Sequence, residues 1–527
     1  MKRLTLNFSV LLIVVATWLT FAYSAALLGA LETYGVQPFT QFKLMAFTLC
    51  FYAFVLALSR FINAFKPLAI ILIIVAAPAS FYMLQYGIVI DSDMLINTME
   101  TDPAEAGDQL STSFFITLIA LGIIPSLLLV YIKIPKARTL TQMKQSLVTA
   151  ACFCFLAVGI AYTSYDDFAS LFRNHRDVKY RIVPFNVISA SVSVIRQKLE
   201  KPAHFNALGQ DAVQTKTSAK PRIMVVILGE TARADHFSLN GYERPTTPML
   251  SQLATSEQLL SYKDAISCGT ATAVSVPCMF SFLTADIYSN AARNSSNVLD
   301  VLENAGINAT WIENNSGCKD VCNRINTTVM NENRCGETDC YDFEMLDELS
   351  SWLQNITQDS IIVLHQMGSH GPAYYKRSPE KLKRFLPECK SEELTNCTKS
   401  EIINAYDNSL LITDRLVSQA VRLLRSHKEL DSSMMYVSDH GESLGDNGIY
   451  LHGLPNWLAP KEQRHIPWIV WPSGTFEMTG NNTDANISHD NFSHTVLGYF
   501  NVETSLYNAS LDLTQFNERY VNASTTP

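Results

Sequence analysis

Ile223-Met-Val-Val-Ile-Leu228, running directly into Gly229-Glu230-Thr231, is the stretch that says most about the architecture of this chain. Six consecutive apolar residues, rich in β-branched side chains, predict a strand that is buried on both faces of a sheet. Such strands are typical of parallel sheets covered by helices, because antiparallel sheets commonly leave one face in water. The stretch therefore indicates an α/β domain.

The same pattern recurs along the rest of the chain. Further short apolar runs occupy 307–312, 361–364, 434–437 and 466–471, and helix-like segments such as 297–305 and 401–424 separate them. Alternation of this kind predicts a doubly wound parallel sheet with helices on both faces. We assign residues 221–527 to this domain.

Polar side chains follow four of these expected strands, at the edge where open α/β sheets bind ligands. The residues that end the runs are Glu230 and Thr231; Glu313, Asn314 and Asn315, with Lys319 close by; His365 and His370; and Asp439, His440 and Glu442. A purely structural sheet has no need to gather Glu, Asp and His on one edge. Because carboxylates, imidazole and a hydroxyl form a mixed O/N ligand set, the sequence predicts a Zn²⁺ site rather than a Mg²⁺ site.

Two more histidines, His370 and His452, stand in loops rich in Gly and Pro. Either one alone would be read as an ordinary loop residue. Together at the same expected edge, they are candidates for general acids or for ligands of a second metal.

A second stretch, Ser267-Cys-Gly-Thr-Ala-Thr-Ala-Val-Ser-Val-Pro-Cys278, places Thr270 and Thr272 just before an apolar, helix-like segment. Pro277 must kink that helix or shift its start. A threonine at a helix start lies where backbone N–H groups favour an anion, and a metal could convert its hydroxyl into an attacking alkoxide. The alternative is a plain helix N-cap beside a structural disulfide.

The first third of the chain reads as membrane-spanning. Of 527 residues, 48% are hydrophobic and only 17% are charged, which suits a membrane protein joined to a soluble domain. Apolar runs near 9–30, 43–63, 67–90, 113–133 and 147–164 each approach the ~20 residues needed to cross a bilayer. The net charge of -9 argues against a nucleic-acid-binding protein.

The charges between these runs predict the orientation. Lys and Arg flank the first run and the second and fourth connections, whereas the third connection, 91–112, is acidic and has neither. The positive-inside rule then places the N-terminus in the cytoplasm and everything after residue 165 outside. We expect a five-helix transmembrane domain over 1–165 and a connector over 166–220, in which 177–201 is either an amphipathic helix on the membrane or a helical linker.

The cysteines support an extracytoplasmic domain. Three of the eleven, Cys50, Cys152 and Cys154, lie in apolar runs, and the other eight form four close pairs after residue 260. An even set of cysteines in polar sequence favours disulfides in an oxidising compartment. Zinc ribbons at Cys318/Cys322 and Cys335/Cys340 are the rival interpretation, although the pairs lack regular C-x-x-C spacing.

Four motifs resemble one known family. Gly-Glu-Thr-Ala-Arg-Ala-Asp-His-Phe-Ser-Leu-Asn-Gly-Tyr (229–242), Ser-Cys-Gly-Thr-Ala-Thr-Ala-Val-Ser-Val-Pro-Cys-Met-Phe-Ser (267–281), His-Gln-Met-Gly-Ser-His-Gly-Pro (365–372) and Ser-Asp-His-Gly-Glu-Ser-Leu-Gly (438–445) are similar to the lipid A phosphoethanolamine transferases. That family includes the mobile colistin resistance enzymes and belongs to the alkaline phosphatase/sulfatase superfamily. The likeness covers nearly the whole chain.

The resemblance implies a role for each candidate residue. Glu230, Thr272, Asp439 and His440 would bind zinc, with Thr272 also the nucleophile. Asn315 and Lys319 would hold the phosphoethanolamine group. His370 and His452 would assist proton transfer or bind a second zinc, which Glu442 would also touch.

In the acidic third connection, Asn97, Thr101 and Glu105 match a pattern that reaches the substrate from the membrane side, with helix capping and solvation as their alternative. The implied disulfides are Cys268–Cys278 and Cys389–Cys397, with Cys318–Cys322 and Cys335–Cys340 found in only some relatives.

The resemblance also implies the activity. The expected enzyme is a monomer in the bacterial inner membrane, with a periplasmic catalytic domain. It would transfer phosphoethanolamine from phosphatidylethanolamine to lipid A through a covalent threonine intermediate, giving polymyxin resistance.

The nearest rival function is a metal-dependent transferase with another lipid donor or another envelope glycan as acceptor, such as a glycerophosphate transferase. A sulfatase would need a Cys/Ser-x-Pro-x-Arg motif that is absent here, and a lipid-binding sensor would need the ligands without the nucleophile.

Overall fold

The computed structural model describes residues 4–101, 103–135, 139–199, 204–215, 218–256, 259–335, 340–472 and 483–515. It divides into two compact units. The first comprises Met1–Leu95 and Leu110–Gln197, and the second comprises Ile96–Gln109 and Lys198–Pro527. Ile96–Gln109, a stretch of the acidic third connection, thus belongs to the same compact unit as the α/β domain.

The first unit is helical. Its helices are α1 (Phe8–Phe21), α2 (Ala25–Thr33), α3 (Pro38–Ser59), α4 (Phe65–Tyr86), α7 (Thr112–Thr117), α8 (Ile124–Tyr131), α9 (Thr139–Thr163), α10 (Tyr165–Asn174) and α11 (Phe185–Leu199), and α5 (Ser92–Glu100) leads from it into the second unit. A π-helical segment, Leu118–Ile123, joins α7 to α8 just before Pro125, whose missing N–H breaks the regular α-helical ladder.

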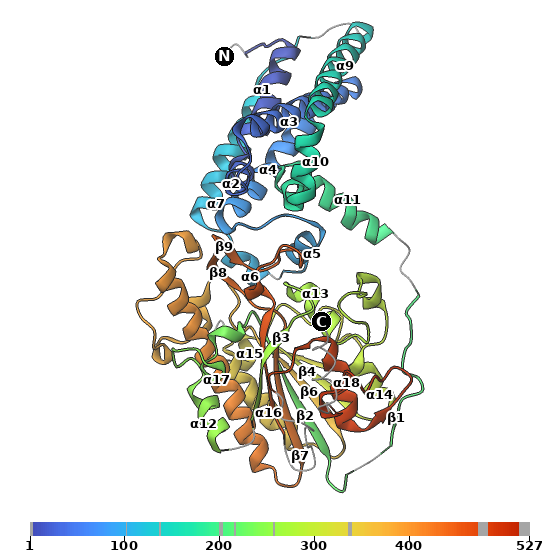
Figure 1. Ribbon diagram of the computed structural model, residues 1–527, viewed down its shortest axis with the longest axis vertical. Helices are drawn as coiled ribbons and strands as arrows, with labels where there is room; N and C mark the ends of the chain where they lie inside the picture. The colour runs from blue at the N-terminus through green and yellow to red at the C-terminus, as the bar shows by residue number, and fades with distance from the viewer. Residues whose placement is uncertain are drawn as a thin grey trace. The chain divides into compact units, whose positions relative to one another are not determined.

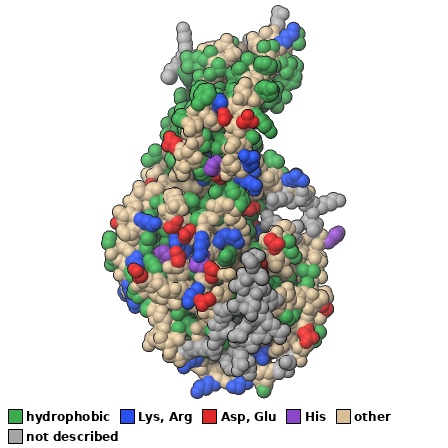
Figure 2. All heavy atoms as spheres, viewed as in Figure 1, with side chains coloured by type: hydrophobic (Ala, Val, Ile, Leu, Met, Phe, Trp, Pro, Cys, Tyr) green, Lys and Arg blue, Asp and Glu red, His purple; other side chains and the backbone are tan. Residues whose placement is uncertain are grey.

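Four stretches of this unit are long and apolar enough to cross a membrane: Pro38–Ile62, Phe65–Tyr86, Thr112–Tyr131 and Thr139–Thr163. The pair α1 and α2 is bent by 50° and supplies a fifth span if it crosses as one. The expected bundle of apolar helices is therefore confirmed, with a bend in its first member. Hydrophobic side chains cover much of the visible face of this unit (Figure 2), as a lipid environment requires.

Helix α11 has two apolar faces. Ala190 and Val194 are buried in the first unit, whereas the exposed apolar residues of the helix recur at helical spacing along its opposite side. These exposed residues are Phe185, Ile188, Val192, Ile195 and Leu199. The helix expected within 177–201 is present, and one of its faces has no protein cover among the described residues.

The second unit is built on an eight-stranded sheet of order β11-β3-β10-β7-β2-β6-β4-β5. The strands are β2 (Arg222–Gly229), β3 (Leu260–Ile266), β4 (Asn308–Glu313), β5 (Asn326–Val329), β6 (Ser360–His365), β7 (Asp431–Ser438), β10 (His465–Trp471) and β11 (Ile487–Ser488). Two small sheets pair β1 (Val213–Gln214) with β12 (Val502–Glu503), and β8 (Ser443–Asp446) with β9 (Ile449–Leu451).

The sheet is mixed rather than wholly parallel. Strand β10 runs antiparallel to both β7 and β3, whereas the neighbouring pairs from β7 to β5 are parallel. The expectation of a parallel sheet is wrong at this strand, because a continuous apolar run shows burial on two faces but does not encode strand direction.

Alternating side chains of β2 enter two separate cores. Met224, Val226 and Leu228 pack in one core with residues of α13 (Thr272–Met279), α14 (Val298–Asn304) and α18 (Asp490–Phe500). Ile223, Val225 and Ile227 pack in the other with α12 (Pro248–Ser256), α16 (Met345–Leu353) and α17 (Lys399–Ser426). Figure 1 shows these two helix sets on opposite faces of the sheet, as expected for a doubly wound fold. Two further short helices, α6 (Pro103–Asp108) and α15 (Glu332–Cys335), complete the unit.

Candidate active site

The candidate site lies where β2 and β7 end beside each other. These parallel strands pair Gly229 with Ser438, so Glu230 and Asp439 follow at the same edge. Ligand atoms of Glu230, Asp439 and His440 all lie within 4.8 Å of one another, and all three residues are buried. Two carboxylates and an imidazole so close together, away from water, form a site for a cation.

Thr272 brings a hydroxyl into this group. It is the first residue of α13, after Ala271 in extended conformation. Its Oγ1 donates to Glu230 Oε2 at 3.1 Å and lies 3.3 Å from His440 Nε2. We call Glu230, Thr272, Asp439 and His440 the Glu230 cluster. Thr270, the other candidate, instead donates its hydroxyl to the Leu454 carbonyl at 2.6 Å.

The ring of His440 is held in the orientation a ligand needs. Its Nδ1 lies 2.8 Å from the Gly441 carbonyl oxygen, so this nitrogen carries the proton and donates it. Nε2 is then an unprotonated nitrogen, 3.2 Å from Asp439 Oδ2 and 3.4 Å from Glu230 Oε1. A backbone carbonyl that fixes the tautomer of a metal-binding histidine is a common arrangement.

One carboxylate oxygen of the cluster lacks a donor. Asp439 Oδ1 accepts from the Thr231 and His440 amides at 3.1 and 2.7 Å. Asp439 Oδ2 is buried and receives no hydrogen bond from any residue that the structure describes. A buried acceptor beside a second carboxylate and an unprotonated imidazole fits a bound Zn²⁺, because the cation would satisfy all three together.

Thr231 joins the two acidic residues. Its hydroxyl donates to Glu230 Oε1, its amide donates to Asp439 Oδ1, and its φ of 59° lies in the left-handed region. A β-branched residue rarely adopts this conformation, and strain of this kind collects at functional sites. The sequence shows Thr231 at a strand end but does not indicate this role.

Burial and mutual repulsion separate the two carboxylates electrostatically. Desolvation alone would raise the pKa of Glu230, but electrostatic interactions with the imidazoles of His440, His370 and His452 outweigh it and lower that pKa. Burial, followed by the charge of Glu230, raises the pKa of Asp439. Without a cation the pair favours one charged and one protonated carboxyl.

Three other sequence candidates lie next to the Glu230 cluster. The His452 ring is centred 4.3 Å from that of His440 and 5.4 Å from that of His370. His452 Nδ1 lies 3.3 Å from Glu442 Oε2, and burial raises the pKa of Glu442 to about 8. This arrangement suits either a proton relay or a second cation.

Asn315, two residues after the end of β4, contacts the cluster. Its side-chain amide donates to Glu230 Oε2 at 2.8 Å and to the Gln366 carbonyl at 3.1 Å. Lys319 instead donates its ammonium to Ser316 and to the Glu100 carbonyl. Asn315 therefore orients a carboxylate of the cluster.

A buried Glu313–His365 pair stands behind Asn315. His365 Nδ1 lies 2.9 Å from Glu313 Oε2, and His365 Nε2 lies 3.3 Å from the Asn315 amide nitrogen. The strand register aligns Glu313 with His365. Sequence reasoning placed both at strand ends without a role, and only knowledge of which strands are neighbours would have joined them.

The candidates in the acidic connection are only partly described. The Thr101 hydroxyl donates to the Asn97 carbonyl at 2.9 Å, one helical turn back in the same connection. No hydrogen bond among the described residues joins Asn97 or Thr101 to the Glu230 cluster. The side chain of Glu105 lies outside the described residues.

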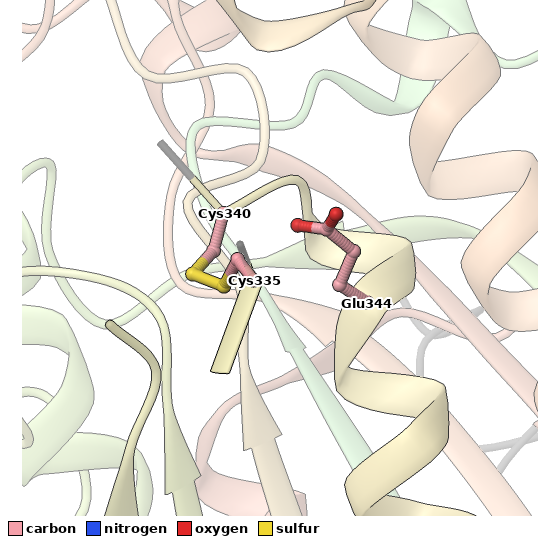
Figure 3. A group of neighbouring side chains, drawn as sticks. All are labelled: Cys335, Cys340 and Glu344. Carbon is pink, nitrogen blue, oxygen red and sulfur yellow. A yellow bond between two sulfur atoms is a disulfide. The ribbon is translucent and has the colours of Figure 1, made fainter. Parts of the chain in front are cut away.

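Eight cysteines of the second unit form four disulfides: Cys268–Cys278, Cys318–Cys322, Cys335–Cys340 and Cys389–Cys397. Cys335, Cys340 and Glu344 also lie close together (Figure 3), but the two sulfurs are bonded and Glu344 accepts from the Tyr341 amide as a helix cap. The pairs leave no thiolates for zinc ribbons at these positions.

Comparison with known proteins identifies the family to which this chain belongs. Residues 48–199 match the family model described as phosphoethanolamine transferase EptA/EptB, and residues 222–502 match the sulfatase model. The chain is 36% identical over 543 residues to phosphoethanolamine transferase EptA of Escherichia coli K12, covering 98% of each chain. The chain belongs to the EptA/EptB family of phosphoethanolamine transferases.

Two other relatives extend the likeness. Phosphatidylethanolamine transferase Mcr-1 from Escherichia coli is 40% identical over 496 residues, with 89% of this chain and 90% of the relative covered. The solved structure of lipooligosaccharide phosphoethanolamine transferase A from Neisseria meningitidis, an integral membrane protein, superposes with a TM-score of 0.93 at 31% identity, covering 97% of this chain and 98% of that one. Family membership and the two-part fold expected from the sequence are thus confirmed.

Proposed function

We propose that this chain transfers phosphoethanolamine from phosphatidylethanolamine to a phosphate of lipid A through a covalent phosphoethanolamine–Thr272 intermediate. The observation that carries the proposal is the position of Thr272 Oγ1, 3.1 Å from Glu230 Oε2 and 3.3 Å from His440 Nε2. Family membership supports the group that is transferred. The names of two relatives, a phosphatidylethanolamine transferase and a lipooligosaccharide phosphoethanolamine transferase, support the donor and the class of acceptor.

Glu230, Asp439, His440 and Thr272 would hold one tightly bound Zn²⁺. The ion would lower the pKa of the hydroxyl and stabilise charge on the phosphoryl oxygens. The chain supplies the rest: the Gly441 carbonyl keeps His440 Nε2 unprotonated, and Thr231 and Asn315 fix the Glu230 carboxylate. His370, His452 and Glu442 are the residues that would hold a second Zn²⁺ if one binds.

The reaction would take two steps. In the first, Thr272 Oγ1 loses its proton and forms a bond to the phosphorus of phosphatidylethanolamine, and the bond to the glycerol oxygen breaks. The glycerol oxygen takes up one proton, so the proton count balances and diacylglycerol leaves neutral; His370 and His452 are the candidates that would relay the proton. In the second, an oxygen of a lipid A phosphate bonds to the same phosphorus, and Thr272 regains its proton as its bond to phosphorus breaks. Two lipids used in turn imply ping-pong kinetics.

The substrate-binding roles of Lys319, Asn97, Thr101 and Glu105 belong to the same proposal. Lys319 would exchange its contact with the Glu100 carbonyl for one with the phosphoethanolamine group. Asn97, Thr101 and Glu105 would reach the lipid from the acidic connection.

We further propose that the N-terminus is cytoplasmic and that residues 221–527 are periplasmic in a bacterial inner-membrane monomer. The positively charged connections of the apolar helices and the four disulfides support this side. The added ethanolamine carries a positive charge, so modified lipid A would attract cationic peptides less strongly and would confer polymyxin resistance.

The test compares two donor lipids with the full chain in detergent. The purified chain receives zinc, lipid A and either phosphatidylethanolamine or phosphatidylglycerol, and both lipid products are measured by mass spectrometry. We expect phosphoethanolamine–lipid A and diacylglycerol in equal amounts from phosphatidylethanolamine, and loss of both after zinc is chelated. Transfer from phosphatidylglycerol alone would establish a glycerophosphate transferase, and binding of both lipids without product would establish a sensor.

A further inference from the structure

The helix that begins with Thr272 contains a carbonyl that its own backbone cannot satisfy. Pro277 lies within α13 and has no N–H, so the carbonyl of Ala273, four residues earlier, lacks its helical donor. Arg293 Nη2 donates to this oxygen at 2.8 Å. A guanidinium therefore replaces the missing helical bond at the residue directly after the proposed nucleophile.

The same guanidinium also binds a residue of the segment Ile96–Gln109. Arg293 Nη1 and Nη2 lie 2.9 and 3.2 Å from the two carboxylate oxygens of Glu100. The pair is largely shielded from water, with side-chain exposures of 14% for Arg293 and 31% for Glu100. A forked, two-bond contact fixes the plane of the guanidinium as well as its position. Lys319 adds a bond to the Glu100 carbonyl at 3.2 Å.

The other end of the segment is held by a similar pairing of a carboxylate with an arginine. Asp108 Oδ2 accepts from Arg377 Nη2 at 3.0 Å, and Asp108 Oδ1 accepts from Lys376 Nζ at 2.6 Å. Arg377 also donates from Nε to the carbonyl of His370 at 2.9 Å. Each end of Ile96–Gln109 thus presents a carboxylate to an arginine that also binds the backbone beside a candidate catalytic residue.

We propose that Glu100 and Arg293, and Asp108 and Arg377, are positioning residues that make the geometry of Thr272 and His370 depend on docking of segment Ile96–Gln109. The carboxylates hold the two arginines in the orientations in which they support the Ala273 and His370 carbonyls. When the segment is displaced, each arginine loses the partner that fixes it, and α13 and the His370 loop lose a backbone contact.

Such dependence suits an enzyme that takes two lipids in turn, because the nucleophile becomes ordered only when the segment is in place. Misplacing reacting atoms by a fraction of an ångström costs rate while leaving the binding groups present. The inference about rate rests on the proposed function of Thr272, whereas the inference about backbone order does not.

The test uses the full chain in detergent with Glu100→Gln and Asp108→Asn, which remove the charge and keep the shape. Amide hydrogen exchange of residues 96–109, 272–279 and 367–371 is followed, together with the rate of the phosphoethanolamine adduct on Thr272. We expect Glu100→Gln to accelerate exchange in 96–109 and 272–279 at least fivefold. We also expect it to slow adduct formation at saturating phosphatidylethanolamine at least tenfold, with KM changed less than twofold. Asp108→Asn should act on 96–109 and 367–371 instead.

Glu348→Gln is the matched control, because Glu348 also pairs with an arginine, Arg334, at the surface of the same unit. It should change none of these exchange rates and leave the adduct rate within twofold.

Pro277→Ala supplies a rescue that a general loss of stability would not show. Adding Pro277→Ala to Arg293→Gln introduces an N–H at position 277 that would satisfy the Ala273 carbonyl. Relative to Arg293→Gln alone, exchange in α13 should therefore slow and the adduct rate should rise, each at least threefold. Exchange in 96–109 should stay fast. Unchanged α13 exchange in both Glu100→Gln and Arg293→Gln would overturn the inference. Faster α13 exchange, with no adduct even on the unsubstituted chain, would refute the role of Thr272 and leave the positioning intact.

Discussion

The side-chain amide of Asn315 donates to Oε2 of Glu230 at 2.8 Å, the same oxygen that receives the Thr272 hydroxyl at 3.1 Å. One carboxylate oxygen is thus shared by the proposed nucleophile and by a residue from the neighbouring part of the sheet edge. This contact makes Asn315 a support for a metal ligand, in addition to the substrate-binding role that the family resemblance suggests.

Replacing Asn315 should weaken zinc binding. In Asn315→Ala the Glu230 carboxylate loses a donor that fixes its orientation, and loss of such supporting contacts typically lowers metal affinity about 10–100-fold. Competition with a chromogenic chelator measures the change. Asn355→Ala, whose amide bonds only to a backbone carbonyl at an exposed site, serves as the control. Unchanged zinc affinity with a raised KM for phosphatidylethanolamine would assign Asn315 to substrate alone.

Acid should destabilise the second unit through His489. This ring is buried between the Cys268 amide and the Ser438 carbonyl, and burial lowers its pKa to about 3. The unfolded chain binds the proton near pH 6.5 and the folded chain does not, so stability is lost as pH falls below about 6.5. Between pH 7.5 and 5.5 the loss attributable to this histidine is about 1.4 kcal/mol.

His489→Gln isolates this contribution, because glutamine can accept and donate in a similar way without titrating in this range. The difference in free energy of unfolding between pH 7.5 and 5.5, from urea titrations of the full chain in detergent, should shrink by about 1.4 kcal/mol. The exposed His204→Gln should leave it unchanged. An equal pH dependence in the His489 variant and the parent would show that the buried ring is not the source.

Helix α11 should lie against lipid with the face that the protein leaves bare. Val192 is 59% exposed and lies at the centre of the apolar stripe, opposite the buried Ala190 and Val194. Exposed apolar stripes of this kind bind membrane interfaces. With the three unpaired cysteines replaced, a fluorophore at Val192→Cys should be quenched by nitroxide lipids at least threefold more strongly than one at Ser193→Cys. Equal quenching at both positions would favour the helical linker.

The sheet edge is predictable from the sequence because strands buried on both faces leave continuous apolar runs, and the carboxyl ends of those strands that are parallel gather in one place. This rule predicts Glu230, Asp439 and His440 among a larger set of strand-end candidates, and the family resemblance selects these three as metal ligands. The choice of Thr272 over Thr270 required the family resemblance, since spacing does not reveal that the Thr270 hydroxyl donates to Leu454.

Contacts between distant parts of the chain were beyond such rules. Three features depend on which elements become neighbours in space: the direction of β10, the pairing of Glu313 with His365, and the ion pair between Arg293 and Glu100. Local periodicity carries burial and turn signals but no information on partners so far apart. The charge of the acidic connection predicts its side of the membrane, and the family resemblance suggests a substrate role for Asn97, Thr101 and Glu105. Its contacts within the second unit are visible only in the structure.

Intact-protein mass spectrometry tests the central claim most directly. The detergent-solubilised chain and Thr272→Ala are incubated with zinc and phosphatidylethanolamine, without lipid A. We predict one phosphoethanolamine adduct on the parent chain alone, which disappears when lipid A is added. The same adduct on both proteins, or none on either with zinc bound and donor lipid intact, would contradict the covalent Thr272 mechanism.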